Sequence, residues 1–203
     1  MSHPLRTIAV VPAAGESRRM GRPKLTLPWR GATVIEAVLE AWRAGGVERV
    51  IVVLRAGDDA LRALCEKRGA ELVIADPPPE DMKASILCGL DFAVHHLPLA
   101  DRWCWLTAPA DMPTLASDVI QNMCQAWEET PDSAVVPVCD GRRGHPVLLP
   151  DRAREPLRAL GDAEGLNRLF ETVEVRELDA GPAALCEDVD TPADYDRLRK
   201  LAE

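Results

Sequence analysis

Residues 10–25 place a cluster of basic side chains directly after an apolar run, a pattern that suits a polyphosphate. The cluster combines four cations with two glycines: Arg18, Arg19, Arg22, Lys24, Gly15 and Gly21. Small residues let backbone N–H groups approach a phosphate, while arginine offers a fork of donors and lysine a point charge. A solvated basic loop accounts for the same cluster equally well. The spacing fits neither G-x-G-x-x-G nor G-x-x-x-x-G-K-[ST], so neither a Rossmann fingerprint nor a P-loop is predicted.

Acidic side chains recur later at two places that could hold a hard cation. Asp111 lies in the segment PADMP after an apolar run at 103–108, and Asp188 and Asp190 lie two residues apart in EDVDTPADY. Residues two apart point the same way in an extended segment, and Mg²⁺ is usually held by one or two carboxylates. Asp111 is explained equally well as a turn or helix-start residue between prolines. A helix start at T-P-A-D explains the end of the second segment, but not the two aspartates before it.

These groups lie where short β-type runs end, which is where open α/β sheets bind their ligands. Such runs recur at 7–12, 49–54, 70–75, 103–108, 134–138, 146–149 and 172–178. Helical patterns separate the first five, so the alternation predicts βαβ units around a mostly parallel sheet. The alternation loosens after residue 140, where we expect the later strands to be antiparallel or to form a sub-region.

Helix signals agree with this alternation. Thr33 and Glu36 form a capping box, and apolar residues then recur on one helical face until the glycine pair at 45–46. Thr191-Pro192 predicts the start of a last helix. Similar but less regular patterns predict helices over 58–68, 83–97 and 116–129.

Length and composition indicate one soluble domain over residues 1–203. The chain is 47% hydrophobic and 28% charged, and its net charge of −9 disfavours nucleic-acid binding. No apolar run approaches the ~18 residues of a membrane helix, and the N-terminus lacks a signal-peptide pattern. We therefore expect a cytoplasmic protein with no membrane partner. The six cysteines form no C-x-x-C pair, and we expect buried, inert thiols rather than zinc or redox chemistry.

The pattern A-A-G-x-S-x-R-M-G-x-P-K at Ala13 to Lys24, followed by LTLPWRG, resembles the MobA-like nucleotidyltransferases, particularly the molybdenum cofactor cytidylyltransferases. The resemblance extends from residue 7 to 200. It implies an α/β fold of three layers, the Rossmann-like nucleotidyltransferase fold of the nucleotide-diphospho-sugar transferase type, with a mostly parallel sheet flanked by helices. In that family this loop wraps a nucleoside triphosphate. The backbone of Ala13, Ala14 and Gly15 would then meet base and phosphates. Arg19 and Lys24 would bind the phosphates and act in catalysis, while Arg18 and Arg22 fall on variable positions and are expected to be solvated.

The resemblance also assigns the acidic groups. A motif ending in A-D-M-P supplies a catalytic carboxylate that binds Mg²⁺, which implies this role for Asp111. A D-x-D-T-P-x-D signature supplies a second metal carboxylate just before Thr-Pro, which implies Asp190 as the other ligand. Asp188 is expected to lie behind the ligands rather than on the metal.

Two further segments of the chain match family segments, one that borders the nucleotide base and one that contacts the acceptor. DMKASILCGL resembles a family segment that borders the base, so Ser85 is a candidate nucleotide contact, although helix capping is the commoner use of such a serine. Asp81 stands where the family usually has glycine, which puts any turn with positive φ there in doubt, and Pro12 lacks an N–H near the base. GRRGHPVLL matches an acceptor segment, which makes His145 an acceptor-binding candidate or a structural hydrogen-bonding residue.

The resemblance implies Mg²⁺-dependent transfer of CMP from CTP to the phosphate of a molybdopterin-type acceptor, with release of pyrophosphate. Guanine-specific members tend to read A-G-G where this chain reads A-A-G, which favours CTP over GTP. A molybdenum hydroxylase is implied as a further partner. Two alternatives remain: nucleotidyl transfer with GTP, another small phosphate or a sugar phosphate, and a non-catalytic nucleotide-binding accessory protein for a molybdenum enzyme.

Overall fold

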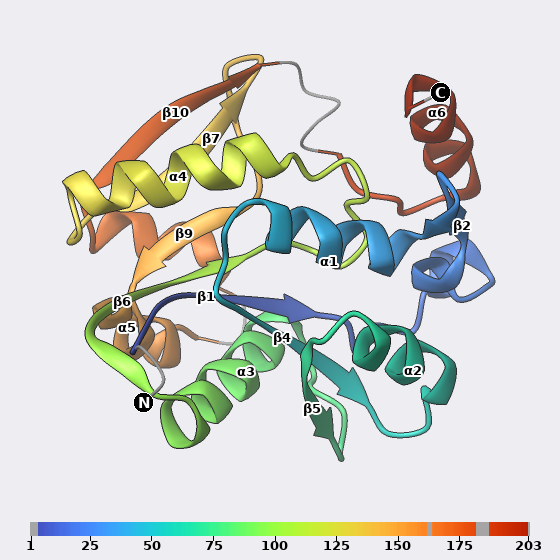
Figure 1. The fold of residues 1–203 in the computed structure, drawn as a ribbon, viewed down its shortest axis with the longest axis horizontal. Coiled ribbons are helices and arrows are strands. Elements are labelled where there is room, and N and C mark those ends of the chain that lie inside the picture. The colour runs from blue at the N-terminus through green and yellow to red at the C-terminus, as the bar shows by residue number, and fades with distance from the viewer. Residues whose placement is uncertain (1–3, 162–163, 182–186, 203) are drawn as a thin grey trace.

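The protein is built around one large β-sheet, seen in a computed structural model that describes residues 4–161, 164–181 and 187–202. The strand order is β10-β7-β9-β6-β1-β4-β5, and β8 pairs with β7 (Figure 1). The strands are β1 (Leu5–Pro12), β4 (Arg49–Arg55), β5 (Glu71–Ala75), β6 (Leu99–Thr107), β7 (Ala134–Cys139), β8 (Arg142–Arg143), β9 (Val147–Pro150) and β10 (Val175–Gly181). A separate hairpin joins β2 (Pro28–Trp29) to β3 (Ala32–Thr33).

Helices cover both faces of the sheet and make three layers. One face carries α1 (Val34–Ala44), α2 (Asp59–Lys67) and α4 (Ser117–Glu129), and the other carries α3 (Met82–His96) and α5 (Arg154–Ala159) (Figure 1). The last helix, α6 (Pro192–Ala202), packs against the hairpin through Tyr195 and Trp29. The fold class predicted from the sequence is therefore confirmed.

Alternation along the strands builds a core on each face. In β1, Ala9 and Val11 are buried under α1 and α4, whereas Ile8 and Val10 are buried under α3. Residues of a strand alternate between faces, and a strand covered on both sides reads as one apolar run. This explains why the apolar runs predicted the central strands so closely.

The second half of the sheet explains why the alternation loosens after residue 140. β9 runs antiparallel to both β6 and β7, while β10 returns parallel to β7.

The sequence analysis did not predict the β2–β3 hairpin, β8 or α5. Each of these has six residues or fewer, too few to show a helical or strand period.

Side-chain caps fix the starts of three helices. Thr33 and Glu36 form the predicted capping box at α1. At α3 the cap is Asp81, whose side chain accepts a hydrogen bond of 2.7 Å from the Ala84 amide. At α6 the Asp194 carboxylate accepts from the Thr191 amide at 2.9 Å, as the T-P-A-D pattern indicates.

Helix α3 lies unusually close to the sheet at Gly89. A Cβ built there would lie 2.5 Å from Cγ1 of Val10 and 3.3 Å from Cγ2 of Val53. Both valines are buried and stiff at χ1. The missing side chain therefore lets α3 pack directly on β1 and β4.

Within the described ranges, no helix is both long and apolar enough to cross a membrane.

Four of the cysteines are free thiols: Cys65, Cys88, Cys104 and Cys124. Burial is the largest cause that raises the pKa of each thiol, to about 12 for Cys65 and about 11 for Cys124. Cys139 is disulfide-bonded, contrary to the expectation of inert thiols, and Cys186 lies outside the described residues.

We predict that Gly89→Ala lowers the unfolding free energy. Alanine gains about 1 kcal/mol of helix propensity over glycine, but forcing a methyl group against Val10 costs about 1–3 kcal/mol in a packed core. Thermal unfolding should show a lower Tm, whereas Val94→Ala, at an exposed site of the same helix, should change it little. An unchanged or higher Tm for Gly89→Ala would contradict the close packing.

We predict that the capping box at α1 makes the stability of the folded protein depend on pH. The pKa of Glu36 is lowered first by its hydrogen bond with Thr33, and also by Arg68. A carboxyl with a depressed folded pKa stabilises the protein above its unfolded pKa of about 4.3, and this contribution is lost as the pH falls through the folded value. Glu36→Gln should therefore lower Tm clearly at pH 7 but progressively less below about pH 4.3. A difference that stays constant from neutral pH to about pH 3 would contradict this.

Candidate active site

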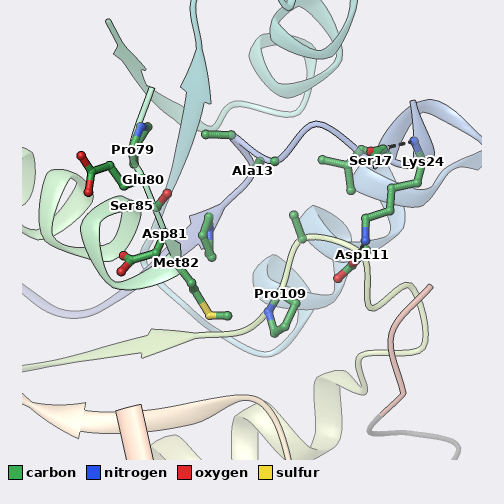
Figure 2. Close-up of a pocket in the computed structure, with 15 residues that line it drawn as sticks. Ala13, Ser17, Lys24, Pro79, Glu80, Asp81, Met82, Ser85, Pro109 and Asp111 are labelled. Atoms are coloured by element: carbon green, nitrogen blue, oxygen red, sulfur yellow. Dashed lines mark hydrogen bonds and ion pairs between the residues drawn. The ribbon is translucent and has the colours of Figure 1, made fainter. Parts of the chain in front are cut away.

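The predicted basic and acidic segments meet at the carboxyl edge of the sheet. The loop of residues 13–24, called here the signature loop, follows β1, and Asp111 follows β6, which pairs in parallel with β1. Together with the start of α3 they enclose an open cavity of about 260 Å³ (Figure 2). Its lining is Pro12, Ala13, Ala14, Gly15, Ser17, Lys24, Leu25, Pro79, Glu80, Asp81, Met82, Ser85, Pro109, Ala110 and Asp111.

Lys24 is the centre of an ion cluster at one end of this cavity. Its Nζ forms an ion pair with Oδ2 of Asp111 and lies 3.1 Å from Oδ1 of Asp190. Figure 2 shows the side chain extending from the loop toward Asp111. Arg19 approaches Asp190 from the solvent side, with 2.7 Å between its guanidinium and Oδ2. The structure thus brings together all four predicted charged residues.

Asp188 completes a group of three carboxylates. One oxygen each of Asp111, Asp188 and Asp190 lie within 4.8 Å of one another. Asp111 is only 7% exposed, and among the described residues its buried Oδ1 has no hydrogen-bond partner. Buried polar atoms are nearly always satisfied, and carboxylate oxygens are the ligands that hard divalent cations prefer. The residues present therefore fit a divalent metal ion, and Asp188 lies close enough to the other two carboxylates to contribute.

Burial and charge act in opposite directions on the pKa values of the central pair. Burial raises the pKa of Asp111, while the Lys24 ammonium acts to lower it, and the net direction is upward. Burial lowers the pKa of Lys24, but Asp111 and Asp190 together outweigh it and the pKa is raised. A nearby opposite charge favours the charged form of each partner.

Two contacts that the sequence did not indicate hold the second acidic segment in place. The Val189 amide donates to the Asp111 carbonyl at 2.8 Å, and the Val189 side chain is fully buried. Tyr195 anchors α6 through a 2.5 Å hydrogen bond to the Pro28 carbonyl. These contacts join residues far apart in the chain, so no local pattern predicts them.

The structure corrects one part of the expected loop contacts. Ala13 lines the cavity, but its amide donates to the Val53 carbonyl at 2.9 Å and is not available to a ligand. Ala14 and Gly15 have amides without a hydrogen-bond partner among the described residues, so they remain the backbone donor candidates. Ser17 shapes the loop with φ of 53°, and its Oγ accepts from the Lys24 amide at 3.3 Å.

The start of α3 forms the opposite wall. Ser85 lines the cavity from within α3 and is buried, so the capping alternative for Ser85 is wrong because Asp81 caps the helix instead. Asp81 has φ of −146°, an extended conformation open to any residue, so its replacement of glycine requires no strained turn. Met82 points across the cavity toward Pro109 (Figure 2). This wall is apolar apart from the Ser85 hydroxyl and the carboxylates at its rim.

His145 does not line the cavity. Its pKa is lowered first by burial, against the raising effects of Asp188 and of the Thr107 backbone. Arg143, in the same segment, pairs with Glu177 at 2.7 Å and lies over the ring of Phe170. His145 therefore lies near Asp188 and outside the cavity that Ser85 lines.

Comparison with known proteins agrees with this geometry. Residues 9–179 match the MobA-like NTP transferase domain. A relative named nicotine blue oxidoreductase, from Paenarthrobacter nicotinovorans, is 29% identical over 93% of this chain and 94% of its own. The molybdenum cofactor cytidylyltransferase of Escherichia coli is 25% identical over 92% of both chains. Several other relatives are named molybdenum cofactor guanylyltransferase.

Solved structures extend the likeness to the whole fold. The crystal structure of Rv0371c from Mycobacterium tuberculosis is 27% identical, covers 98% of this chain and 100% of its own, and superposes with a TM-score of 0.81. A second structure of Rv0371c is described as a complex with manganese; it is 26% identical over 96% and 98% of the two chains, with a TM-score of 0.73. With its matched domain and the shared fold, the chain belongs to the MobA-like NTP transferases, a family of nucleotidyltransferases.

Proposed function

We propose that this protein is a Mg²⁺-dependent nucleotidyltransferase that transfers CMP from CTP to the phosphate of a molybdopterin-type acceptor. One observation carries the proposal. Lys24 of the signature loop and the carboxylates of Asp111 and Asp190 converge at the edge of a single cavity. A site that must hold a triphosphate and a cation together requires this juxtaposition of opposite charges.

Each residue has a distinct task in this proposal. The amides of Ala14 and Gly15 donate to phosphate oxygens as the chain turns out of β1. Lys24 and Arg19 bind the triphosphate and take up the negative charge that grows as pyrophosphate departs. Ser85 faces the base within the cavity. Catalysis then depends on positioning and electrostatics, because the acceptor phosphate is itself the nucleophile.

Asp111 and Asp190 would hold the Mg²⁺ ion, with Asp188 near enough to contribute. The buried Oδ1 of Asp111, which lacks a partner among the described residues, supports this assignment. The ion, when bound, neutralises the triphosphate and orients its α-phosphoryl group. Asp111 is the more constrained ligand because burial and the ion pair with Lys24 fix its orientation.

Two observations bear on the identity of the base. The A-A-G reading at residues 13–15 and the cytidylyltransferase among the relatives support CTP. Relatives named guanylyltransferase support GTP as the second candidate. The oxidoreductase among the relatives suggests different chemistry, but this chain has no G-x-G-x-x-G dinucleotide fingerprint after β1.

His145 is the proposed contact for the acceptor. It lies close to Asp188 and to Thr107 at the end of β6. Burial lowers the pKa of His145, while Asp188 and the Thr107 backbone act to raise it. The proposed role rests on the place of His145 just before β9, at the carboxyl edge of the sheet. A molybdenum hydroxylase would receive the finished cofactor. A non-catalytic binding protein would not need paired carboxylates opposite the phosphate-binding cations.

Asp111→Asn and Lys24→Ala should each reduce turnover at least ~100-fold, because each removes a preorganised charge from the reacting centre. Pyrophosphate release from CTP, Mg²⁺ and a molybdopterin-type acceptor is the measurement. Lys67→Ala, on the exposed end of α2, serves as the control and should keep nearly full turnover. Near-wild-type rates in both site variants would refute the assignment.

Thermal shift with each nucleoside triphosphate and Mg²⁺ tests the base. A ligand that binds the folded state raises stability by RT ln(1 + [L]/Kd), so the preferred nucleotide should raise Tm most. We expect CTP to exceed GTP, ATP and UTP. A response to GTP alone would overturn the cytidylyl assignment while leaving nucleotidyl transfer intact.

A further inference from the structure

The Lys24 ammonium lies where a cation bound to the carboxylates would lie. It contacts Oδ2 of Asp111 and Oδ1 of Asp190, and these two aspartates also belong to the group of three that fits a divalent ion. Oδ1 of Asp111 is buried and has no hydrogen-bond partner among the described residues. Lys24 therefore acts as the counter-ion of this acidic group in the protein alone.

When the nucleotide binds, the Lys24 side chain is needed at the triphosphate rather than at the carboxylates. Three carboxylates lying so close repel one another, and burial of Asp111 strengthens the repulsion. A divalent ion arriving alone would have to displace the ammonium and leave it beside a dication. A triphosphate arriving alone would draw the ammonium away and leave carboxylates without a counter-ion facing a polyanion. Either ligand alone thus meets an unfavourable charge balance, and the pair together does not.

We propose that Lys24 is a built-in counter-ion that makes the divalent ion and the nucleoside triphosphate bind cooperatively. The ion takes over the carboxylates of Asp111 and Asp190 while the Lys24 ammonium passes to the triphosphate. This inference deepens the proposed function, on which it rests for the identity of the two ligands. By linkage, each ligand must then raise the affinity for the other by the same factor.

The surroundings of Lys24 allow this exchange. Its side chain lines the nucleotide cavity and also a second cavity of about 490 Å³ between the signature loop and α2. The ammonium sits on a flexible four-carbon stem with three donors. Arg19 pairs with Asp190 as well, but its side chain is 72% exposed and it reaches one carboxylate only. Lys24, at 17% exposed and bridging two carboxylates, is therefore the main competitor of the ion.

The test measures Mn²⁺ binding to the full-length protein without nucleotide, by electron paramagnetic resonance or calorimetry. Lys24→Gln should bind Mn²⁺ at least ~10-fold more tightly than the wild type, within the usual range of coupling between sites. Arg22→Gln removes the same charge from the same loop at a residue that lies over Tyr195, and should change affinity less than about twofold, as a screened surface charge does. Arg19→Gln should give an intermediate gain, and it supplies an answer if Lys24→Gln folds poorly.

A second titration adds a non-reacting CTP or GTP analogue with a methylene group between the α- and β-phosphates. The analogue should raise Mn²⁺ affinity strongly in the wild type and weakly in Lys24→Gln, because the coupling is lost with the ammonium. Equal Mn²⁺ affinity in wild type and Lys24→Gln, an equal gain in Arg22→Gln, or no binding in any variant would each overturn the inference. Absence of pyrophosphate release would refute the proposed function alone, since Mn²⁺ binding is read without turnover.

Discussion

An ammonium group held between two carboxylates is the interaction on which the geometry of this site depends. Lys24 belongs to the first loop of the chain, whereas Asp190 lies 166 residues later, next to the last helix. Leaving the buried Asp111 without a cationic partner would cost several kcal/mol. The fold must therefore deliver three distant segments to one point, and the contacts around that point all act to keep them there.

The sheet and the last helix supply this positioning in different ways. Parallel pairing of β1 with β6 brings the signature loop and Asp111 to the same edge, as carboxyl ends of neighbouring parallel strands must lie. The acidic segment 188–190 has no strand to carry it. It is fixed instead by the Val189–Asp111 backbone hydrogen bond and by the anchoring of Tyr195 on the β2–β3 hairpin.

Much of this arrangement was readable in the sequence because its signals are local. The capping boxes at Thr33 and Thr191 and the apolar runs of the central strands need only neighbouring residues to act. Arg19 and Lys24 were found through the long signature motif, and Asp111 and Asp190 through two further motifs of the resembled family. Other features depend on tertiary approach: the Ala13 amide donates to the Val53 carbonyl, and the Val189 amide donates to the Asp111 carbonyl. Sequence patterns carry no trace of such contacts, and only the folded chain reveals them.

The reversed direction of β9 has a consequence for how such a site can diversify. Thr107 pairs with Val147, so the antiparallel strand enters the sheet at the carboxyl edge and delivers His145 there from its beginning. The connection that precedes it starts at the end of β7, at the same edge. Insertions or substitutions in this connection would alter one half of the cleft, while β1, α3 and the signature loop would keep their positions. Under the proposed function, a single scaffold could thus take different acceptor molecules without rebuilding the half that is assigned to the triphosphate.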